Sequence, residues 1–193
     1  FHTPVRLKGP APEFSSEWTK AYQQFLKAWT AHIAELGFGY DNYAVYPVDE
    51  PGLDDGFLVD TFMKWAVPTR EADPSILFYA NPVGHIKMEQ LQRMKPYVDI
   101  WAPLHVGAWA GSGDTDLAEK LAVMHSSNAR LWNYHCAHDA KHQSPLGYYR
   151  CQAWMVWSHG HAGMGFYTYS RNGDDAWYFA PFEYDMVYGG EGV

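Results

Sequence analysis

The fold of this chain is decided around one run of residues, Tyr46-Pro47-Val48-Asp49-Glu50-Pro51-Gly52. Residues 40–48 are rich in Tyr and Val, which predicts a buried strand. Pro51 and Gly52 then end the strand pairing and turn the chain. Two adjacent carboxylates therefore follow the C-terminal end of a strand, which is where a barrel enzyme carries its catalytic acids.

The orientation of Asp49 and Glu50 depends on how regular this strand is. Neighbouring side chains of a regular strand point to opposite faces of the sheet. Pro47 and the following turn disfavour regular pairing, so we expect both carboxylates to face one cavity. An Asp-Glu-Pro run taken alone more often marks a solvated acidic turn, and its interpretation therefore depends on the rest of the chain.

Composition restricts the classes of partner. The chain has 193 residues, of which 47% are hydrophobic and only 19% charged, so it is globular and can bury a sizeable core. A net charge of -8 without a Lys and Arg cluster disfavours nucleic acid and anionic membranes as partners. Aromatic residues make up 17%, and sugar sites use such rings as apolar platforms with a polar edge. We therefore expect a neutral ligand such as a glycan, with some of the rings in the core.

Other features suggest neither a membrane anchor nor a disulfide framework. No apolar run approaches the roughly 18 to 20 residues that span a bilayer. Cys136 and Cys151 are too few for a disulfide framework, and the sequence does not say whether they meet. Because Phe1 is not a natural start, we expect the chain to be part of a longer one.

We expect no metal and no cofactor. His135, His138 and His142 lie near Cys136, but their spacing matches no standard zinc pattern and no second ligand pair follows. The glycines form no phosphate-binding fingerprint. Histidines in a polar loop are more often hydrogen-bonding groups.

The chain alternates helices and strands. Ser15 or Ser16 caps a first helix, whose apolar residues recur at helical spacing as far as Gly37, a C-terminal cap. After the Asp-Glu strand, the pattern predicts a helix at 56–65, a strand at 75–80, a helix at 88–94, a strand at 98–104, a helix capped by Asp114, a strand at 130–136, a helix at 144–159 and a strand at 164–170.

This alternation predicts an α/β fold with parallel strands and right-handed crossovers. We count five strands, whereas a complete eight-fold barrel takes about 250 residues. The chain is therefore expected to hold the later strand-helix units of a (β/α)8 TIM-type barrel, as a single partial domain over 1–193. A doubly wound sheet is the alternative.

In such a barrel the C-terminal ends of all strands share one mouth. Every candidate residue at these ends is polar. They are Asp49, Glu50, Asn81, His105, Tyr134, His135, Tyr167 and Tyr169.

Five segments carry a resemblance to a known family. They are Tyr46-Pro47-Val48-Asp49-Glu50-Pro51, Val98-Asp99-Ile100-Trp101-Ala102-Pro103, Leu131-Trp132-Asn133-Tyr134-His135-Cys136, Tyr149-Arg150 with Ala153-Trp154, and Gly165-Phe166-Tyr167-Thr168-Tyr169. In order and spacing, over about 40–193, they resemble the catalytic barrel of glycoside hydrolase family 123 and the related DUF4091 domains. Tyr169 departs from the Trp that relatives often carry near the end of the last strand.

The resemblance implies a retaining exo-β-N-acetylgalactosaminidase in which the substrate's own acetamido group assists catalysis. Glu50 would be the general acid/base, and Asp49 would orient and polarise the acetamido nitrogen. For an enzyme of this type we expect Tyr134, Tyr167, Tyr169 and Trp177 to shape the sugar pocket. The resemblance also implies a periplasmic or extracellular location.

Geometry favours the same mechanism. The two carboxyls of a conventional glycosidase flank the sugar about 5 to 5.5 Å apart when retaining and about 6.5 to 9.5 Å apart when inverting. Two consecutive residues cannot easily straddle a ring, but they can serve one side of it together. Two alternatives stay open: a conventional glycosidase that pairs Glu50 with Asp139, Asp174 or Asp175, and a non-catalytic carbohydrate-binding barrel.

Overall fold

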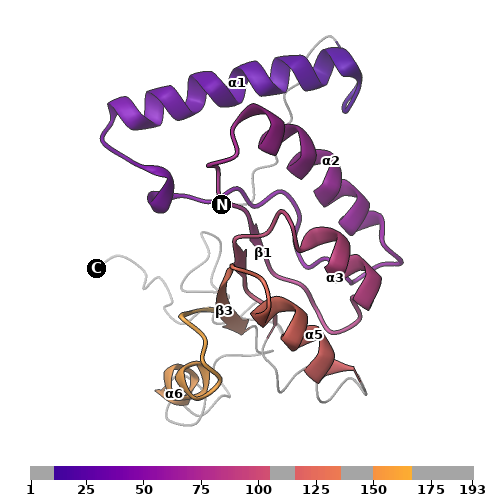
Figure 1. Cartoon of the computed structure of the whole chain (residues 1–193), viewed down its shortest axis with the longest axis vertical. Helices are drawn as coiled ribbons and strands as arrows, with labels where there is room; N and C mark the ends of the chain where they lie inside the picture. The colour runs from indigo at the N-terminus through magenta and orange to yellow at the C-terminus, as the bar shows by residue number, and fades with distance from the viewer. Residues whose placement is uncertain (1–10, 105–115, 136–149, 167–193) are drawn as a thin grey trace, which may run out of the picture.

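The structure is a computed structural model that describes residues 11–104, 116–135 and 150–166 (Figure 1). Within these ranges four strands form one sheet in chain order: β1 (Tyr79–Ala80), β2 (Ile100–Trp101), β3 (Arg130–His135) and β4 (Gly163–Phe166). All pairs are parallel, with Tyr79 opposite Ile100, Ile100 opposite Arg130, and Trp132 opposite Gly163. The predicted α/β class and the parallel pairing are confirmed.

Helices connect the strands. α3 (Met88–Met94) lies between β1 and β2, α5 (Leu117–His125) between β2 and β3, and α6 (Cys151–Ser158) between β3 and β4. Before β1 come α1 (Ser16–Glu35), the short 3-10 helix η1 (Tyr40–Asn42) and α2 (Phe57–Ala72). Asp114 and residues 144–149, where the sequence predicts two helix starts, lie outside the described residues.

The prediction of α1 is confirmed at both ends. The Ser15 Oγ accepts a hydrogen bond from the Trp18 amide at 3.2 Å, which satisfies one free donor of the first turn. At the other end Gly37, with φ of +87°, donates to the Ala34 carbonyl at 2.9 Å, and Phe38 donates to the Ile33 carbonyl at 3.1 Å. This pair of bonds is the Schellman arrangement, in which glycine takes the left-handed position at no steric cost.

The sequence-based end of α2 at residue 65 is wrong, because the helix continues to Ala72 through Pro68. Proline lacks the amide proton that a helix interior needs, so the chain alone favours an earlier end. Contacts from α1 support the extra turns: Tyr22 and Thr69 share a buried hydrogen bond of 2.8 Å, and Gln23 Nε2 donates to the Pro68 carbonyl at 3.1 Å.

The prediction of a continuous strand over 40–48 is also wrong. Tyr40 to Asn42 form η1, and only Val45 pairs, through a single parallel bridge to Phe78. Val45 donates to the Leu77 carbonyl at 2.7 Å and accepts from the Tyr79 amide at 3.0 Å. Pro47 has no amide proton to continue this ladder. Residues 43–48 nevertheless lie beside β1, next in order along the sheet.

The strand predicted at 75–80 shortens to Tyr79–Ala80 because side chains replace ladder bonds before it. The Phe78 amide donates to Asp99 Oδ2 at 2.7 Å, and the Ile76 carbonyl accepts from Arg70 Nη1 at 2.7 Å. β2 is likewise shorter than the predicted 98–104, although the Leu104 amide still donates to the Pro82 carbonyl at 3.1 Å.

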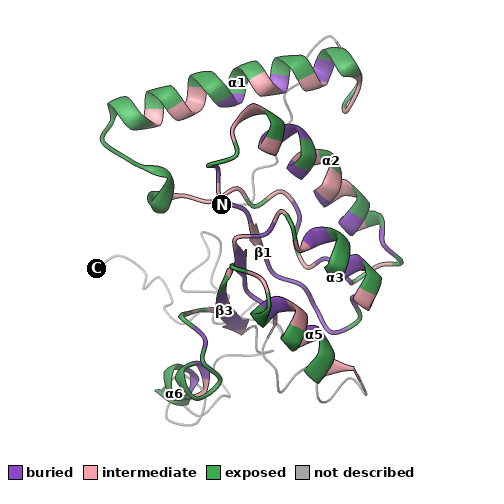
Figure 2. Ribbon diagram, in the orientation of Figure 1, coloured by how far each residue is buried: buried purple, intermediate pink, exposed green. Residues whose placement is uncertain are grey.

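One face of the sheet packs against helices (Figure 2). Side chains of alternate strand residues join a buried cluster with residues of α2, α3 and α5: Phe78, Ala80, Trp101, Leu131, Phe62, Leu91, Met94 and Met124. Because neighbouring residues of a strand point to opposite faces, Tyr79, Trp132 and Tyr134 lie on the other face.

Two side-chain contacts cross the sheet on that second face. β1 and β2 lie between residues 43–48 and β3. Arg130 at the start of β3 donates to Asp41 at 3.0 Å, and the Tyr134 hydroxyl near its end donates to Glu50. Both ends of β3 are therefore joined to the 41–50 segment across this face.

Arg70 joins α2 to the N-terminal ends of β1 and β2. Its guanidinium donates to the carbonyls of Pro74, Ile76 and Tyr97 at 2.7 to 2.8 Å and to the carboxylate of Asp99. The side chains of Arg70 and Asp99 are only 19% and 31% exposed, so water has little access to replace the hydrogen bonds of Arg70.

Replacement of Arg70 by Met should lower the free energy of unfolding by about 2 to 3 kcal/mol, because it leaves a half-buried carboxylate and several carbonyls unpaired. The matched control is Arg93→Met, which removes an exposed ion pair with Asp60 and should cost less than about 1 kcal/mol. Urea unfolding of both variants measures the difference. Equal losses in the two variants would contradict the role assigned to Arg70.

Candidate active site

Asn81 holds the Asp-Glu pair. It follows β1 directly and is 4% exposed. Its amide nitrogen donates to Asp49 Oδ1 at 2.9 Å, and its amide oxygen accepts from the Glu50 backbone amide at 3.0 Å. One planar side chain therefore fixes both the carboxylate of Asp49 and the backbone of Glu50 at the C-terminal end of β1.

The backbone of Glu50 departs from an extended strand. Its φ of +48° lies in the left-handed region, which costs a residue with a Cβ atom about 1 to 3 kcal/mol. The resulting turn replaces strand alternation, so Asp49 and Glu50 need not point to opposite faces. Asp49 reaches Asn81 and Glu50 reaches Tyr134, both at the C-terminal ends of parallel strands.

Two tyrosine hydroxyls bind the two carboxylates. Tyr46 donates to Asp49 Oδ1, and Tyr134 of β3 donates to Glu50 Oε1. Burial is the largest cause that raises the pKa of each phenol, followed by the hydrogen bond to its carboxylate. The negative charges of Glu50 and Asp49 also raise the pKa of Tyr134. Both phenols are therefore proton donors at neutral pH.

Aromatic rings extend this group along the second face of the sheet. The rings of Tyr46 and Tyr79 meet edge to face at 5.1 Å, and those of Tyr79 and Trp132 lie 6.3 Å apart. Burial, and then the charge of Asp49, raises the pKa of Tyr79 to about 12. Tyr46, Tyr79 and Trp132 are not among the site residues predicted from the sequence. The spacing of two residues from Asn81 and from Tyr134 nevertheless places Tyr79 and Trp132 on the same strand faces as these residues.

The Pro51-Gly52 turn packs directly on the loop after β1. The Val83 amide donates to the Pro51 carbonyl at 3.1 Å. Gly52 has φ of +109°, and a Cβ atom there would lie 2.7 Å from the backbone nitrogen of Ile86. Glycine is therefore required both for the turn and for the contact between the two loops.

The structure brings together Asp49, Glu50, Asn81 and Tyr134 from the set predicted by sequence. His135 is half-buried at the end of β3, where it pairs with Phe166. The other predicted residues lie outside the described part of the chain: His105, Tyr167, Tyr169 and Trp177, together with the alternative carboxylates Asp139, Asp174 and Asp175. Cys136 is also outside it, whereas Cys151 is exposed at the start of α6.

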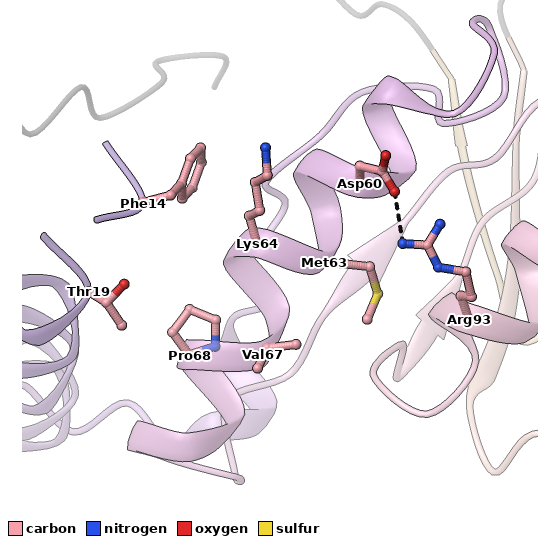
Figure 3. A pocket seen from close by; sticks show the side chains of 8 residues that line it. All are labelled: Phe14, Thr19, Asp60, Met63, Lys64, Val67, Pro68 and Arg93. Carbon is pink, nitrogen blue, oxygen red and sulfur yellow. Dashed lines mark hydrogen bonds and ion pairs between the residues drawn. The ribbon is translucent and has the colours of Figure 1, made fainter. Parts of the chain in front are cut away.

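Within the described ranges, no group of three or more His, Cys, Asp or Glu residues could hold a metal ion. No helix in those ranges has the length and apolar character needed to cross a membrane. A separate hollow of about 530 Å³ lies among α1, α2 and α3, and it is lined by Phe14, Thr19, Asp60, Met63, Lys64, Val67, Pro68 and Arg93 (Figure 3). Tyr46, Asn81 and Tyr134, which bind Asp49 and Glu50, do not line that hollow.

No protein-family model matches the chain, and no curated protein matches it. The geometry around Asp49 and Glu50 is therefore the basis for assigning a function, together with the resemblance of its motifs.

Replacement of Gly52 by Ala should cost about 3 kcal/mol of unfolding free energy, since the methyl group adds a clash with Ile86 to the strain of a positive φ. Gly37→Ala is the matched control. Its φ is also positive, but no atom lies within 4 Å of the new methyl group, so it should cost only about 1 kcal/mol. Chemical denaturation compares the two. A Gly52 variant no less stable than the Gly37 variant would show that the loops are not in tight contact.

Stability should fall as pH rises from 10 to about 12, because in this interval the folded protein retains the Tyr79 proton that the unfolded chain releases. This contribution is fully present below pH 10. Tyr79→Phe should make the fall shallower, and Asp49→Asn should do so by less, since burial is the larger cause. Thermal unfolding from pH 9 to 12 measures both slopes, and an unchanged slope in Tyr79→Phe would contradict the raised pKa.

Proposed function

We propose that this chain is the catalytic part of a glycoside hydrolase, a retaining substrate-assisted β-N-acetylhexosaminidase that removes terminal β-linked N-acetylgalactosamine from a glycan. The proposal rests on the adjacent pair Asp49 and Glu50. Asn81 holds both residues on one side of the site, and a separate tyrosine hydroxyl binds each carboxylate.

The fold supports a barrel whose later units this chain would contain. Within the described ranges the strands follow one another in chain order, and α2, α3 and α5 share one buried cluster on one face. A doubly wound sheet has helices on both faces and reverses its strand order at a switch point. In a barrel the carboxyl ends of the strands form the active-site mouth. Asn81 directly follows β1 and Tyr134 lies near the end of β3, and these two residues bind Asp49 and Glu50.

The pairing of Asp49 with Glu50 supports substrate assistance. A conventional glycosidase needs carboxyls on opposite sides of the scissile bond. Here Asn81 binds both consecutive residues, which keeps them on one side. If the substrate's acetamido oxygen attacks the anomeric carbon, Glu50 protonates the leaving oxygen and then activates water, while Asp49 accepts the acetamido N–H.

The neighbouring tyrosines suit these roles. Tyr46 and Asn81 fix Asp49 before a substrate arrives, so little reorganisation is needed to orient the acetamido group. Tyr134 fixes Glu50 and stays protonated at neutral pH. The rings of Tyr79 and Trp132 supply apolar surface with polar edges on the second face of the sheet, which suits a sugar.

The test compares two aryl β-galactosides with a poor leaving group, one with a 2-acetamido and one with a 2-hydroxyl group. The unsubstituted protein should cleave only the galactoside with the 2-acetamido group. Glu50→Gln should lower kcat by about 10² to 10⁴-fold because proton transfer is lost, and Asp49→Asn should lower it by a similar factor. Glu89→Gln, an exposed carboxylate in the first turn of α3, is the matched control and should keep full activity.

Each other outcome contradicts a part of the proposal. Equal cleavage of both sugars would indicate a conventional glycosidase in which Glu50 works with a distant carboxylate. Binding of amino sugars without hydrolysis would indicate a carbohydrate-binding barrel.

A further inference from the structure

Lys120 is an unusual residue for a protein interior. It lies in the second turn of α5 and is 4% exposed, whereas lysine is almost never fully buried unless it is paired. Its Nζ donates to the Gly84 carbonyl at 2.9 Å and forms an ion pair with Asp116 Oδ1 at 3.0 Å. The buried ammonium group thus joins α5 to the loop that follows β1.

That loop, residues 81–84, is buried throughout and is held from three directions. The Leu104 amide, beyond β2, donates to the Pro82 carbonyl at 3.1 Å, and the Val83 amide donates to the Pro51 carbonyl at 3.1 Å. Lys120 supplies the third attachment through Gly84. The first residue of the same loop is Asn81, which binds Asp49 and Glu50.

We infer that Lys120 is a positioning residue of the carboxylate site: by binding the Gly84 carbonyl it fixes the 81–84 loop, and through Asn81 it holds Asp49 and Glu50 in their working geometry. The kinetic part of this inference rests on the proposed function. Catalysis is sensitive to such support, since a misplacement of about 1 Å can cost about 10²-fold in rate.

The decisive variant is Lys120→Met, which keeps an unbranched apolar stem but cannot donate a hydrogen bond. Lys95→Met is the matched control. Lys95 Nζ donates to Ser126 Oγ at 2.9 Å and thereby joins the ends of α3 and α5, at the other end of these helices. Lys120→Gln is a milder second variant, since it keeps an N–H donor, one bond nearer the backbone than the Lys120 Nζ, but loses the positive charge.

Two readouts separate positioning from general stability. In the Lys120→Met variant, kcat on the 2-acetamido aryl galactoside should fall at least tenfold relative to the unsubstituted protein, while KM changes less than threefold. Backbone amides of 81–86 and 49–53 should exchange hydrogen faster, while those of α1 and α2 keep their protection. Lys120→Gln should change both readouts in the same direction by less, and Lys95→Met should change neither.

Several results would overturn the inference. For Lys120→Met they are unchanged amide hydrogen exchange in 81–86, hydrogen exchange that rises equally throughout the chain, or a kcat within twofold of the unsubstituted protein. If Lys120→Met does not fold, the same criteria apply to Lys120→Gln. If the unsubstituted protein cleaves neither sugar, the proposed function fails by itself. A selective rise of hydrogen exchange at 81–86 and 49–53 in Lys120→Met then still decides whether Lys120 positions the turn that carries Asp49 and Glu50.

Discussion

The amide side chain of Asn81 is the contact on which the rest of the site depends. It binds the Asp49 carboxylate and the Glu50 amide simultaneously, and it stabilises a backbone at Glu50 that a residue with a Cβ atom seldom adopts. Strain of this kind persists only where surrounding contacts over-determine it. Here the contacts come from the 81–84 loop, which is itself fixed by Leu104 beyond β2, by Lys120 of α5 and by Pro51.

Contacts across the second face of the sheet join these local contacts into one site. Tyr134 and Glu50 are 84 residues apart, and β1 and β2 lie between their segments. Their hydrogen bond forms because parallel pairing places the C-terminal ends of the strands at the same edge of the sheet. The same face also carries Tyr46, Tyr79 and Trp132. Burial next to negative charge keeps the phenols of Tyr46 and Tyr79 protonated. The result is a polar, preorganised group of donors and acceptors beside aromatic surface.

Sequence reasoning worked where local patterns decide the structure. The ends of α1 follow from Ser15 and Gly37, and α3 was predicted with its observed bounds of Met88–Met94, because caps and helical periodicity are properties of neighbouring residues. It failed where tertiary contacts replace local rules. Helix α2 continues through Pro68 because α1 supports that turn. Residues 40–48 are no continuous strand because Tyr40 to Asn42 form η1 and Pro47 interrupts the ladder after Val45.

Local patterns are enough to predict that strands and helices alternate, that the strands pair in parallel, and that two carboxylates and an asparagine follow neighbouring strand positions. Contacts between distant segments settle which hydroxyl binds which carboxylate, bring Tyr46, Tyr79 and Trp132 to the site, and place buried Lys120 against the Asn81 loop. The difference follows from distance along the chain. Periodicity records which face a residue occupies, whereas contacts between remote segments depend on strand register and loop packing.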